Sequence, residues 1–497
     1  MASETTGAVL RPGENCWRIE RAAQASVIVD AEQYFRFARS AMLKARKRIM
    51  LIGWDFDARI NLGTSEEAKA APQKIGDFIY WLVQRNPELE VYLLRWDIGA
   101  LKTLLRGTTI FTVFKWMLHS RIHTKLDGAH PAGASHHQKI VVIDDCFAFC
   151  GGIDMTGDRW DTREHRDEEP DRRRPNGRPY KPWHDATTAL EGPVSAALAE
   201  HSRHRWMIAG GHELQPVAEN NPCWPEGLAP QFRDVDIAIA RSAPEIPDSP
   251  AVIEIEQLYL DQIARAKRFI YAESQYFASR KIAVAIAKRL EEADGPEIVI
   301  INPVTAQGWL EPLAMDTARA RLFEALRARD QHGRFRMYHP QTAGGEPIYV
   351  HAKILIVDDV VLRVGSSNMN NRSLRLDTEC DVTIDCESPA NSECGPIIER
   401  VRDDLLAEHL GCDITAVQET LRDTGSLIAT IEALRGSGKT LQAYETPDLN
   451  AVEKWLADNE VLDPEGPEEM FEALSGRGLF RGLRAWRQRR KDAAAAR

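Results

Sequence analysis

The sequence predicts an α/β fold in which two similar halves are joined in one chain. The first observation is an internal repeat: residues 17–23 align with 237–243, and residues 45–51 align with 265–271 at the same offset. The second is that strand-like and helix-like segments alternate in both copies. The third is a short polar motif that occurs once in each copy. Alternating strands and helices favour an α/β sandwich with much parallel pairing.

Each half contains a helix-like segment that leads into an apolar strand. Apolar residues recur at helical spacing in residues 34–48 and 255–268, and an apolar run follows in both places. After a further helical stretch, strand-like runs come at 89–96 and 296–304. We therefore expect two equivalent units packed about a pseudo-two-fold axis, with their motifs facing each other.

The repeated motif is His-x-Lys, four apolar or β-branched residues, and then Asp. Its two copies consist of His137, Lys139 and Asp144, and of His351, Lys353 and Asp358. A turn of small residues follows each copy, at 151–154 and 365–368. Because a strand projects alternate side chains to one face, a histidine and a lysine two positions apart point the same way. Two such pairs indicate a site that grips and attacks a phosphate.

These patterns predict three regions: a first half at 15–218, a second half at 231–410, and a polar, helical C-terminal appendage at 411–497. The charged, proline-containing segment 161–182 lacks periodicity and predicts a mobile loop that could flank the cleft. Residues 219–230 are a second loop at the boundary between the halves.

The composition is that of a globular protein, with 43% hydrophobic and 28% charged residues and a net charge of −11. This charge argues against broad attraction to nucleic acid, so an anionic substrate needs a local basic patch. We find no secretory signal and no apolar run long enough to span a membrane. The eight cysteines form no disulfide-like or metal-binding pattern, so we expect a cytoplasmic protein, although export without a cleaved signal stays open.

The paired motif resembles the signature of the phospholipase D superfamily, over roughly residues 15–410. Further segments are similar to its lipid-acting branch rather than its nucleases, namely 52–57, 182–185, 271–277 and 405–411. The resemblance implies a duplicated α/β/α sandwich. It also implies a reaction through a covalent phosphohistidine, without a metal or other cofactor.

By this resemblance, His137 is the nucleophile and His351 the general acid and base. Crossed pairing is expected, with Glu379 orienting His137 and Asp185 orienting His351. The two lysines would neutralise the non-bridging oxygens of the phosphate as charge builds in the transition state. The motif aspartates complete the signature, and we expect them to hold the strand end and its turn rather than to touch substrate.

Two further groups of candidate residues surround the motifs. The phosphate-binding candidates in the turns are Gly152, Asp154, Ser366 and Asn368. Residues that could line a substrate channel, or equally belong to the core and rim, are Trp54, Asp55, Trp96 and Tyr276.

Three other features lie outside this set of candidates. Residues 436–440 are similar to part of a nucleotide-binding loop, but the preceding glycine and strand are missing, so they predict a turn. His136 alternates away from His137 and is interpreted as structural. Residues 477–491 predict a basic amphipathic helix that could contact a membrane interface or dock on the protein itself.

The expected function is hydrolysis of a phospholipid headgroup diester to phosphatidic acid, together with transfer of the phosphatidyl group to alcohols. A cardiolipin synthase-type phosphatidyltransferase is the alternative, followed by a metal-independent nuclease and by a non-catalytic lipid-binding protein. The expected partner is a phospholipid and not nucleic acid, with peripheral membrane contact through 477–491. Because both motifs lie in one chain, a monomer could form a complete site.

Overall fold

The computed structural model describes residues 9–446 except 64–69, 98–111, 307–314 and the single residues 113, 117, 132, 220 and 248. The predicted amphipathic segment 477–491 lies outside the described residues. Within them, no helix is both long and apolar enough to cross a membrane.

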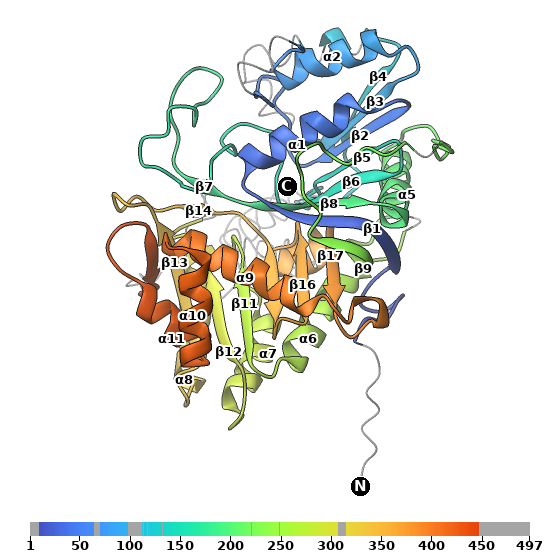
Figure 1. Cartoon of the computed structure of the whole chain (residues 1–497). Helices are drawn as coiled ribbons and strands as arrows, with labels where there is room; N and C mark the ends of the chain where they lie inside the picture. The colour runs from blue at the N-terminus through green and yellow to red at the C-terminus, as the bar shows by residue number, and fades with distance from the viewer. Residues whose placement is uncertain are drawn as a thin grey trace, which may run out of the picture.

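A single mixed sheet runs through both halves (Figure 1). From the centre outward, the first half contributes β1 (Arg18–Val29), β8 (Ala186–Glu191), β6 (Phe147–Gly151), β5 (Ile140–Ile143), β2 (Arg48–Gly53), β3 (Glu90–Trp96) and β4 (Ile122–Asp127). The second contributes β9 (Phe232–Ala243), β17 (Glu379–Asp385), β16 (Val361–Gly365), β15 (Ile354–Val357), β11 (Phe269–Glu273), β12 (Glu297–Ile301) and β13 (Phe335–Gln341). The two orders correspond strand for strand, which confirms the predicted duplication.

The two halves meet where β1 and β9, the equivalent first strands, pair antiparallel. Among the described strands of this sheet, parallel pairing is confined to β2–β3–β4 and β11–β12–β13, and the strands between them are antiparallel. The predicted extent of parallel pairing was therefore too large. The short strand β10 (Val252–Ile253) pairs with β9.

Helices cover both faces of the sheet, which confirms the expected α/β/α layering. One face packs on α1 (Ala31–Leu43) and α2 (Ile75–Arg85) in the first half and on α6 (Glu254–Arg265), α7 (Arg280–Glu291) and α8 (Thr317–Arg329) in the second. The other packs on α5 (Pro193–Ile208), α9 (Gly395–Leu410), α10 (Ile414–Thr424) and α11 (Leu427–Leu434). In β2, Ile49 and Leu51 belong to the first of these cores and Met50 and Ile52 to the second, as a period of two requires.

The described part of the C-terminal region is not a separate appendage. Strand β18 (Thr440–Ala443) pairs with β13 and so extends the sheet of the second half. The turn predicted at 436–440 is present as the bend that leads into this strand. An edge strand is positioned by backbone hydrogen bonds to one neighbouring strand. The side-chain pattern of this short stretch therefore gives little indication of where in the sheet it pairs.

The segment 161–182 has irregular backbone, as predicted, but buried polar contacts hold it in place. Arg172 is buried and donates hydrogen bonds to the Asp161 carboxylate. His165 is fully buried and lies against Glu408 of α9. The loop is therefore anchored at Arg172 and His165. The sequence did not indicate these anchors, because the residues are polar and leave no periodic pattern.

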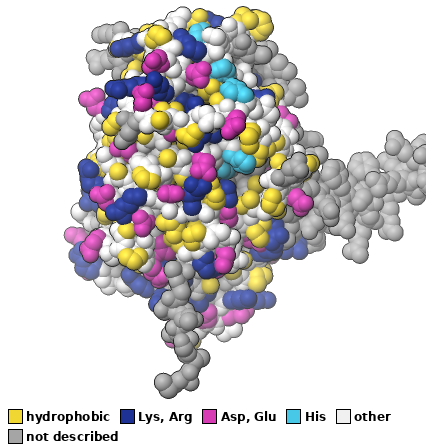
Figure 2. Space-filling model, turned by 90° about the vertical axis from the view of Figure 1, so that its right-hand side faces the viewer, with side chains coloured by type: hydrophobic (Ala, Val, Ile, Leu, Met, Phe, Trp, Pro, Cys, Tyr) yellow, Lys and Arg dark blue, Asp and Glu magenta, His cyan; other side chains and the backbone are white. Residues whose placement is uncertain are grey.

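On the face shown in Figure 2, basic and acidic side chains are interspersed.

Candidate active site

Both motif histidines lie three residues before a strand rather than inside it, at the point where one half touches the other. The His137 N–H donates to the carbonyl of Thr378 (3.0 Å), and the His351 N–H donates to the carbonyl of His184 (2.8 Å). In the second contact, β14 (Tyr349–Val350) and β7 (Trp183–His184) pair in parallel. Each histidine is thus presented by backbone pairing with the opposite half.

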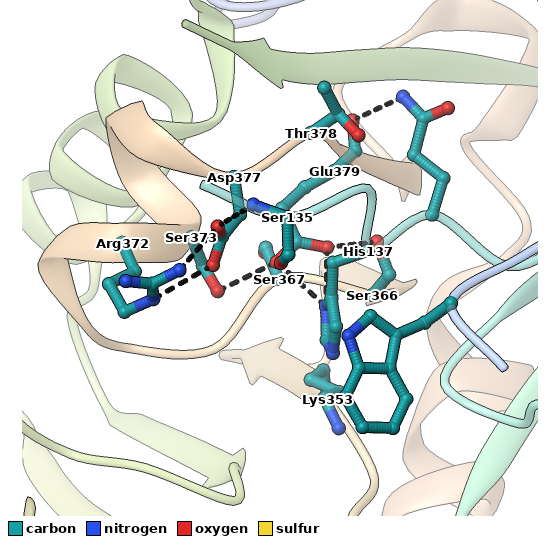
Figure 3. Close-up of polar contacts among 12 residues, drawn as sticks. Ser135, His137, Lys353, Ser366, Ser367, Arg372, Ser373, Asp377, Thr378 and Glu379 are labelled. Atoms are coloured by element: carbon teal, nitrogen blue, oxygen red, sulfur yellow. Dashed lines mark hydrogen bonds and ion pairs between the residues drawn. The ribbon is translucent and has the colours of Figure 1, made fainter. Parts of the chain in front are cut away.

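The His137 imidazole is held by Glu379, the first residue of β17. Its Nδ1 lies 2.9 Å from both carboxylate oxygens of Glu379. The hydroxyls of Ser366 and Ser373 donate to the same carboxylate, at 2.5 and 2.7 Å (Figure 3). Fixing Nδ1 in this way leaves Nε2 as the reactive nitrogen of the ring.

The His351 imidazole is held by Asp185, which directly precedes β8. Its Nδ1 lies 2.7 Å from Asp185 Oδ2, while Oδ1 accepts the N–H of Ala186 at 2.8 Å. The carboxylate can approach because residue 152 is glycine: a Cβ at that position would lie 2.3 Å from Asp185 Oδ1. Both crossed contacts expected from the family resemblance are therefore present in the structure.

The motif lysines lie close beside the two imidazoles. Lys139 Nζ donates to the His137 carbonyl at 2.7 Å and lies 3.3 Å from Asp154 Oδ2. Lys353 Nζ donates to the His351 carbonyl. Both lysine side chains are buried, so their charges face few compensating water dipoles.

Burial and these cations control the titration of the site. Burial lowers the pKa of His137 well below its ordinary range, and the charges of Lys139 and Lys353 add to this shift. Burial and Lys353 likewise lower the pKa of His351. Burial also lowers the pKa of Lys353 to about 7, against the opposing charge of Asp185. The unliganded site therefore favours neutral imidazoles, the form in which a histidine is a nucleophile.

Burial raises the pKa of Glu379 well above its ordinary range, although Lys139 and Ser366 oppose this effect. The same cause raises the pKa of Asp185, which Lys353 opposes. The geometry is consistent with a shared proton between each imidazole and its carboxylate.

The motif aspartates lie at the far end of their strands from the histidines. Asp144 accepts the backbone N–H groups of Arg46, Lys47 and Arg48. Asp358 accepts the equivalent groups of residues 267–269. Each thus fixes the entry of the neighbouring strand, which is the role expected for it from the sequence.

Two of the turn residues lie against the carboxylates that hold the two histidines. Ser366 Oγ is buried and donates to Glu379, and Gly152 makes room for Asp185. Asp154 accepts the backbone N–H of Trp54 at 3.0 Å, besides its approach to Lys139. Asn368 is buried, and its Oδ1 has no hydrogen bond within the described part of the chain. Of the four phosphate-binding candidates, Asn368 carries amide N–H groups that can donate to a phosphate oxygen, whereas Ser366 already donates to Glu379 and an ionised Asp154 can only accept.

The channel candidates separate into two groups. Trp54 stacks on Trp96, with ring centroids 5.7 Å apart, and meets His137 edge-on at 6.3 Å, so both belong to the rim of the site. Asp55 is buried and accepts a hydrogen bond from Thr156, and the Tyr276 hydroxyl accepts one from Gln275. These two form the second group, which is held by contacts within the protein.

Sequence reasoning missed an aromatic and cationic wall beside His351. Trp183 stacks on Tyr349 at 4.6 Å, and its ring lies 5.2 Å from that of His351. The guanidinium of Arg159 lies 4.2 Å over Trp183. Arg159 lies five residues after the first turn, so its proximity in sequence to the motif could have indicated it.

His136, expected to be structural, is buried between Thr378 and Asp127.

Two family models match this chain. Residues 41–223 match the model described as phospholipase D, and residues 259–401 match one described as cardiolipin synthase, PLD-like domain. The two matches cover the two halves that carry the motifs. The chain belongs to the phospholipase D superfamily.

Curated relatives from this superfamily include phospholipase D alpha 1 of Carica papaya, 24% identical, and of Arabidopsis thaliana, 25% identical. These matches cover 80% and 81% of this chain but only 60% and 61% of the relatives. Among solved structures, phosphatidylserine synthase of Haemophilus influenzae Rd KW20 is similar with a TM-score of 0.52 and 15% identity. That match covers 84% of this chain and 97% of the other, and it shows the same fold.

Proposed function

We propose that this protein cleaves the headgroup phosphodiester of glycerophospholipids through a phosphohistidine intermediate. The observation that carries this proposal is the crossed pair: two imidazoles with lysines beside them, each held by a carboxylate of the opposite half. The family matches and the similarity to plant phospholipases D support a phospholipid as substrate.

In the first step, Nε2 of His137 attacks phosphorus. An N–P bond forms, the bond from phosphorus to the headgroup oxygen breaks, and His351 as an imidazolium gives its proton to that oxygen. Lys139 and Lys353 stabilise the charge on the non-bridging oxygens, and the amide of Asn368 adds a hydrogen bond. The negative charge of the bound diester favours the protonated form of His351.

In the second step, a water or an alcohol attacks the phosphohistidine. His351 takes the proton of the attacking hydroxyl, an O–P bond forms, and the N–P bond to His137 breaks. Water gives phosphatidic acid, and an alcohol gives the corresponding phosphatidyl alcohol. The proposed site requires no metal in either step, because side chains supply the cations.

Phosphatidyl transfer to the glycerol hydroxyl of phosphatidylglycerol is the second candidate. The observation that favours it is the match of residues 259–401 to a model described as cardiolipin synthase. A nuclease uses the same chemistry but is less well supported, since the net charge of −11 opposes a polyanion.

The test is incubation of the purified protein with mixed phospholipid vesicles and a short primary alcohol, followed by lipid analysis. We expect phosphatidic acid and the phosphatidyl alcohol, both absent with His137→Ala and both retained with His332→Ala, whose side chain is exposed. Cardiolipin as the main product in vesicles of phosphatidylglycerol would favour the synthase. Cleavage of a labelled oligonucleotide with no lipid product would overturn both lipid functions.

A further inference from the structure

A second group of buried histidines and carboxylates lies beside the reacting pair. Its members are Asp30 before α1, His165 of the segment 161–182, His184 of β7 and Glu408 of α9. All four side chains are at most 2% exposed, and one potential ligand atom from each lies within 4.8 Å of the others. The proposed reaction uses none of them.

The distances fit four ligands around one small ion. Glu408 Oε1 lies 2.9 Å from His184 Nδ1 and 3.1 Å from His165 Nε2. Asp30 Oδ1 lies 3.3 Å from His184 Nδ1, and Asp30 Oδ2 lies 3.4 Å from His165 Nε2. Tetrahedral zinc with ligands at about 2.0–2.2 Å has ligand edges of roughly 3.4 Å, so small shifts suffice to enclose an ion.

The outer nitrogens of both rings already have partners. His165 Nδ1 lies 3.0 Å from Asp161, and His184 Nε2 lies 2.8 Å from Glu273. An ionised carboxylate only accepts hydrogen bonds, so a neutral imidazole places its single N–H on this outer side. The inner nitrogens then present lone pairs, as in metal sites where an outer carboxylate orients the ligating histidine.

The centre of the group therefore collects two nitrogen lone pairs and two carboxylates. The Arg163 guanidinium already pairs with Glu408 Oε2 at 2.5 Å, outside the centre, and protons on the inner nitrogens or one divalent cation would supply positive charge at the centre itself. With two protons, both inner nitrogens approach the same Glu408 oxygen most closely, and Asp30 Oδ2 is left buried without a hydrogen bond among the described residues. A single cation engages all four groups.

We propose that Asp30, His165, His184 and Glu408 bind one divalent transition-metal ion, for which Zn²⁺ is the best match. Two imidazoles and two carboxylates are ordinary ligands of zinc, and four protein ligands leave no open position, as in structural sites. The ion is separate from the proposed reaction, in which the side chains supply the cations.

The position of the group explains what such an ion would do. It would link Glu408 of the second half to three ligands of the first. Asp30 is also tied to Asp185, because its N–H donates to the Asp185 carbonyl at 2.8 Å and its Oδ1 accepts the Asp185 N–H at 3.1 Å. The ion would thus fix the segment that carries Asp185, whose carboxylate holds His351.

The first experiment is elemental analysis of the full chain, purified without chelator and free of any histidine tag. We expect about one equivalent of transition metal in the wild type and in His201→Gln, and none in His165→Gln. His201 is a matched control because it is a buried histidine outside the group, without a side-chain hydrogen bond in the described structure. Metal retained at the wild-type level in His165→Gln would overturn the site as adventitious binding.

The second experiment needs no variant and therefore does not depend on how well His165→Gln folds. Metal removed with a chelator should lower the melting temperature of the wild type, and Co²⁺ should restore it with visible absorption typical of tetrahedral nitrogen and oxygen ligation. No metal in the isolated protein, no uptake of Zn²⁺, Co²⁺, Mn²⁺ or Fe²⁺, and no change in melting temperature would show that the group holds protons instead. These measurements are independent of lipid cleavage, so the two proposals can fail separately.

Discussion

The two halves of this protein share seven equivalent strands of the sheet but differ in the length of the connection that follows the motif turn. In the first half, 31 positions separate Asp154 in the turn from Asp185, whereas in the second only 11 separate Asn368 from Glu379. The short connection contains the π-helical turn η3 (Arg372–Leu376), whereas the long one contains Asp161 and His165. The duplicated strands hold the reacting groups, and the unequal connection adds the buried polar group.

A smaller difference concerns how each carboxylate reaches its histidine. In the first half the short side chain of Asp185 lies against Gly152, which has no side chain to obstruct it. In the second half the longer Glu379 meets Ser366, the equivalent of Gly152, and accepts a hydrogen bond from its hydroxyl. The turn residue and the carboxylate beside it therefore differ together between the two halves, while each carboxylate still holds its histidine.

The largest predicted effect separates the roles of the two histidines. With a natural phospholipid, His137→Ala and His351→Ala should each lower kcat by at least about 10⁴-fold, as expected for groups that act together. With a phosphatidyl ester of p-nitrophenol, His351→Ala should regain a burst of p-nitrophenol, because this leaving group needs no proton. His137→Ala should show no burst. A burst from His137→Ala and none from His351→Ala would reverse the assignment.

The next effect compares the two turn positions. Gly152→Ala should lower kcat by roughly 10²-fold, because the new Cβ displaces Asp185 and a misplaced catalytic group costs about this much. Ser366→Ala removes one of the hydrogen bonds to Glu379 and should cost only about tenfold. Both are measured as kcat with unchanged thermal melting as the control for folding. Equal losses would mean that the two halves hold their carboxylates in the same way.

The pH dependence of kcat/KM should report the unliganded site. Since burial lowers the pKa of His137, its neutral form persists below pH 6.5, and the acidic limb should lie below that value. The His351 proton, which burial makes easier to lose, sets the start of the basic limb below pH 6.5. Since the pKa of Lys353 is about 7, its charge is present below pH 7 and lost above, which should steepen the fall in activity above pH 7. Lys353→Arg should remove this steepening. The same steep fall above pH 7 in Lys353→Arg would contradict this assignment.

The smallest effects concern the motif aspartates. Asp144→Asn and Asp358→Asn should leave kcat nearly unchanged in the folded enzyme but lower its stability. Each change weakens hydrogen bonds from backbone groups at the start of a strand, which should cost about 1–3 kcal/mol. Urea unfolding followed by fluorescence measures this cost. A loss of kcat comparable to that of His137→Ala would show that these aspartates take part in the reaction.

The sequence alone determined the duplication, the α/β layering and the positions of both motifs. Hydrophobic periodicity reports burial of neighbouring side chains, so the alternation of β2 could be predicted from residues 49–52. The carboxylates that hold the histidines came from resemblance, because local patterns carry no information about partners 242 and 166 positions away.

Only the tertiary structure decided which polar groups meet. His184 and Glu408 are 224 positions apart and come together through α9, and a single glycine opens the approach of Asp185. The same holds for β18, whose place at the sheet edge follows from backbone pairing with β13. Polar contacts between distant segments depend on the geometry of the completed fold and leave no periodic trace in the chain, which is why the sequence indicated the chemistry of the site but not its supports.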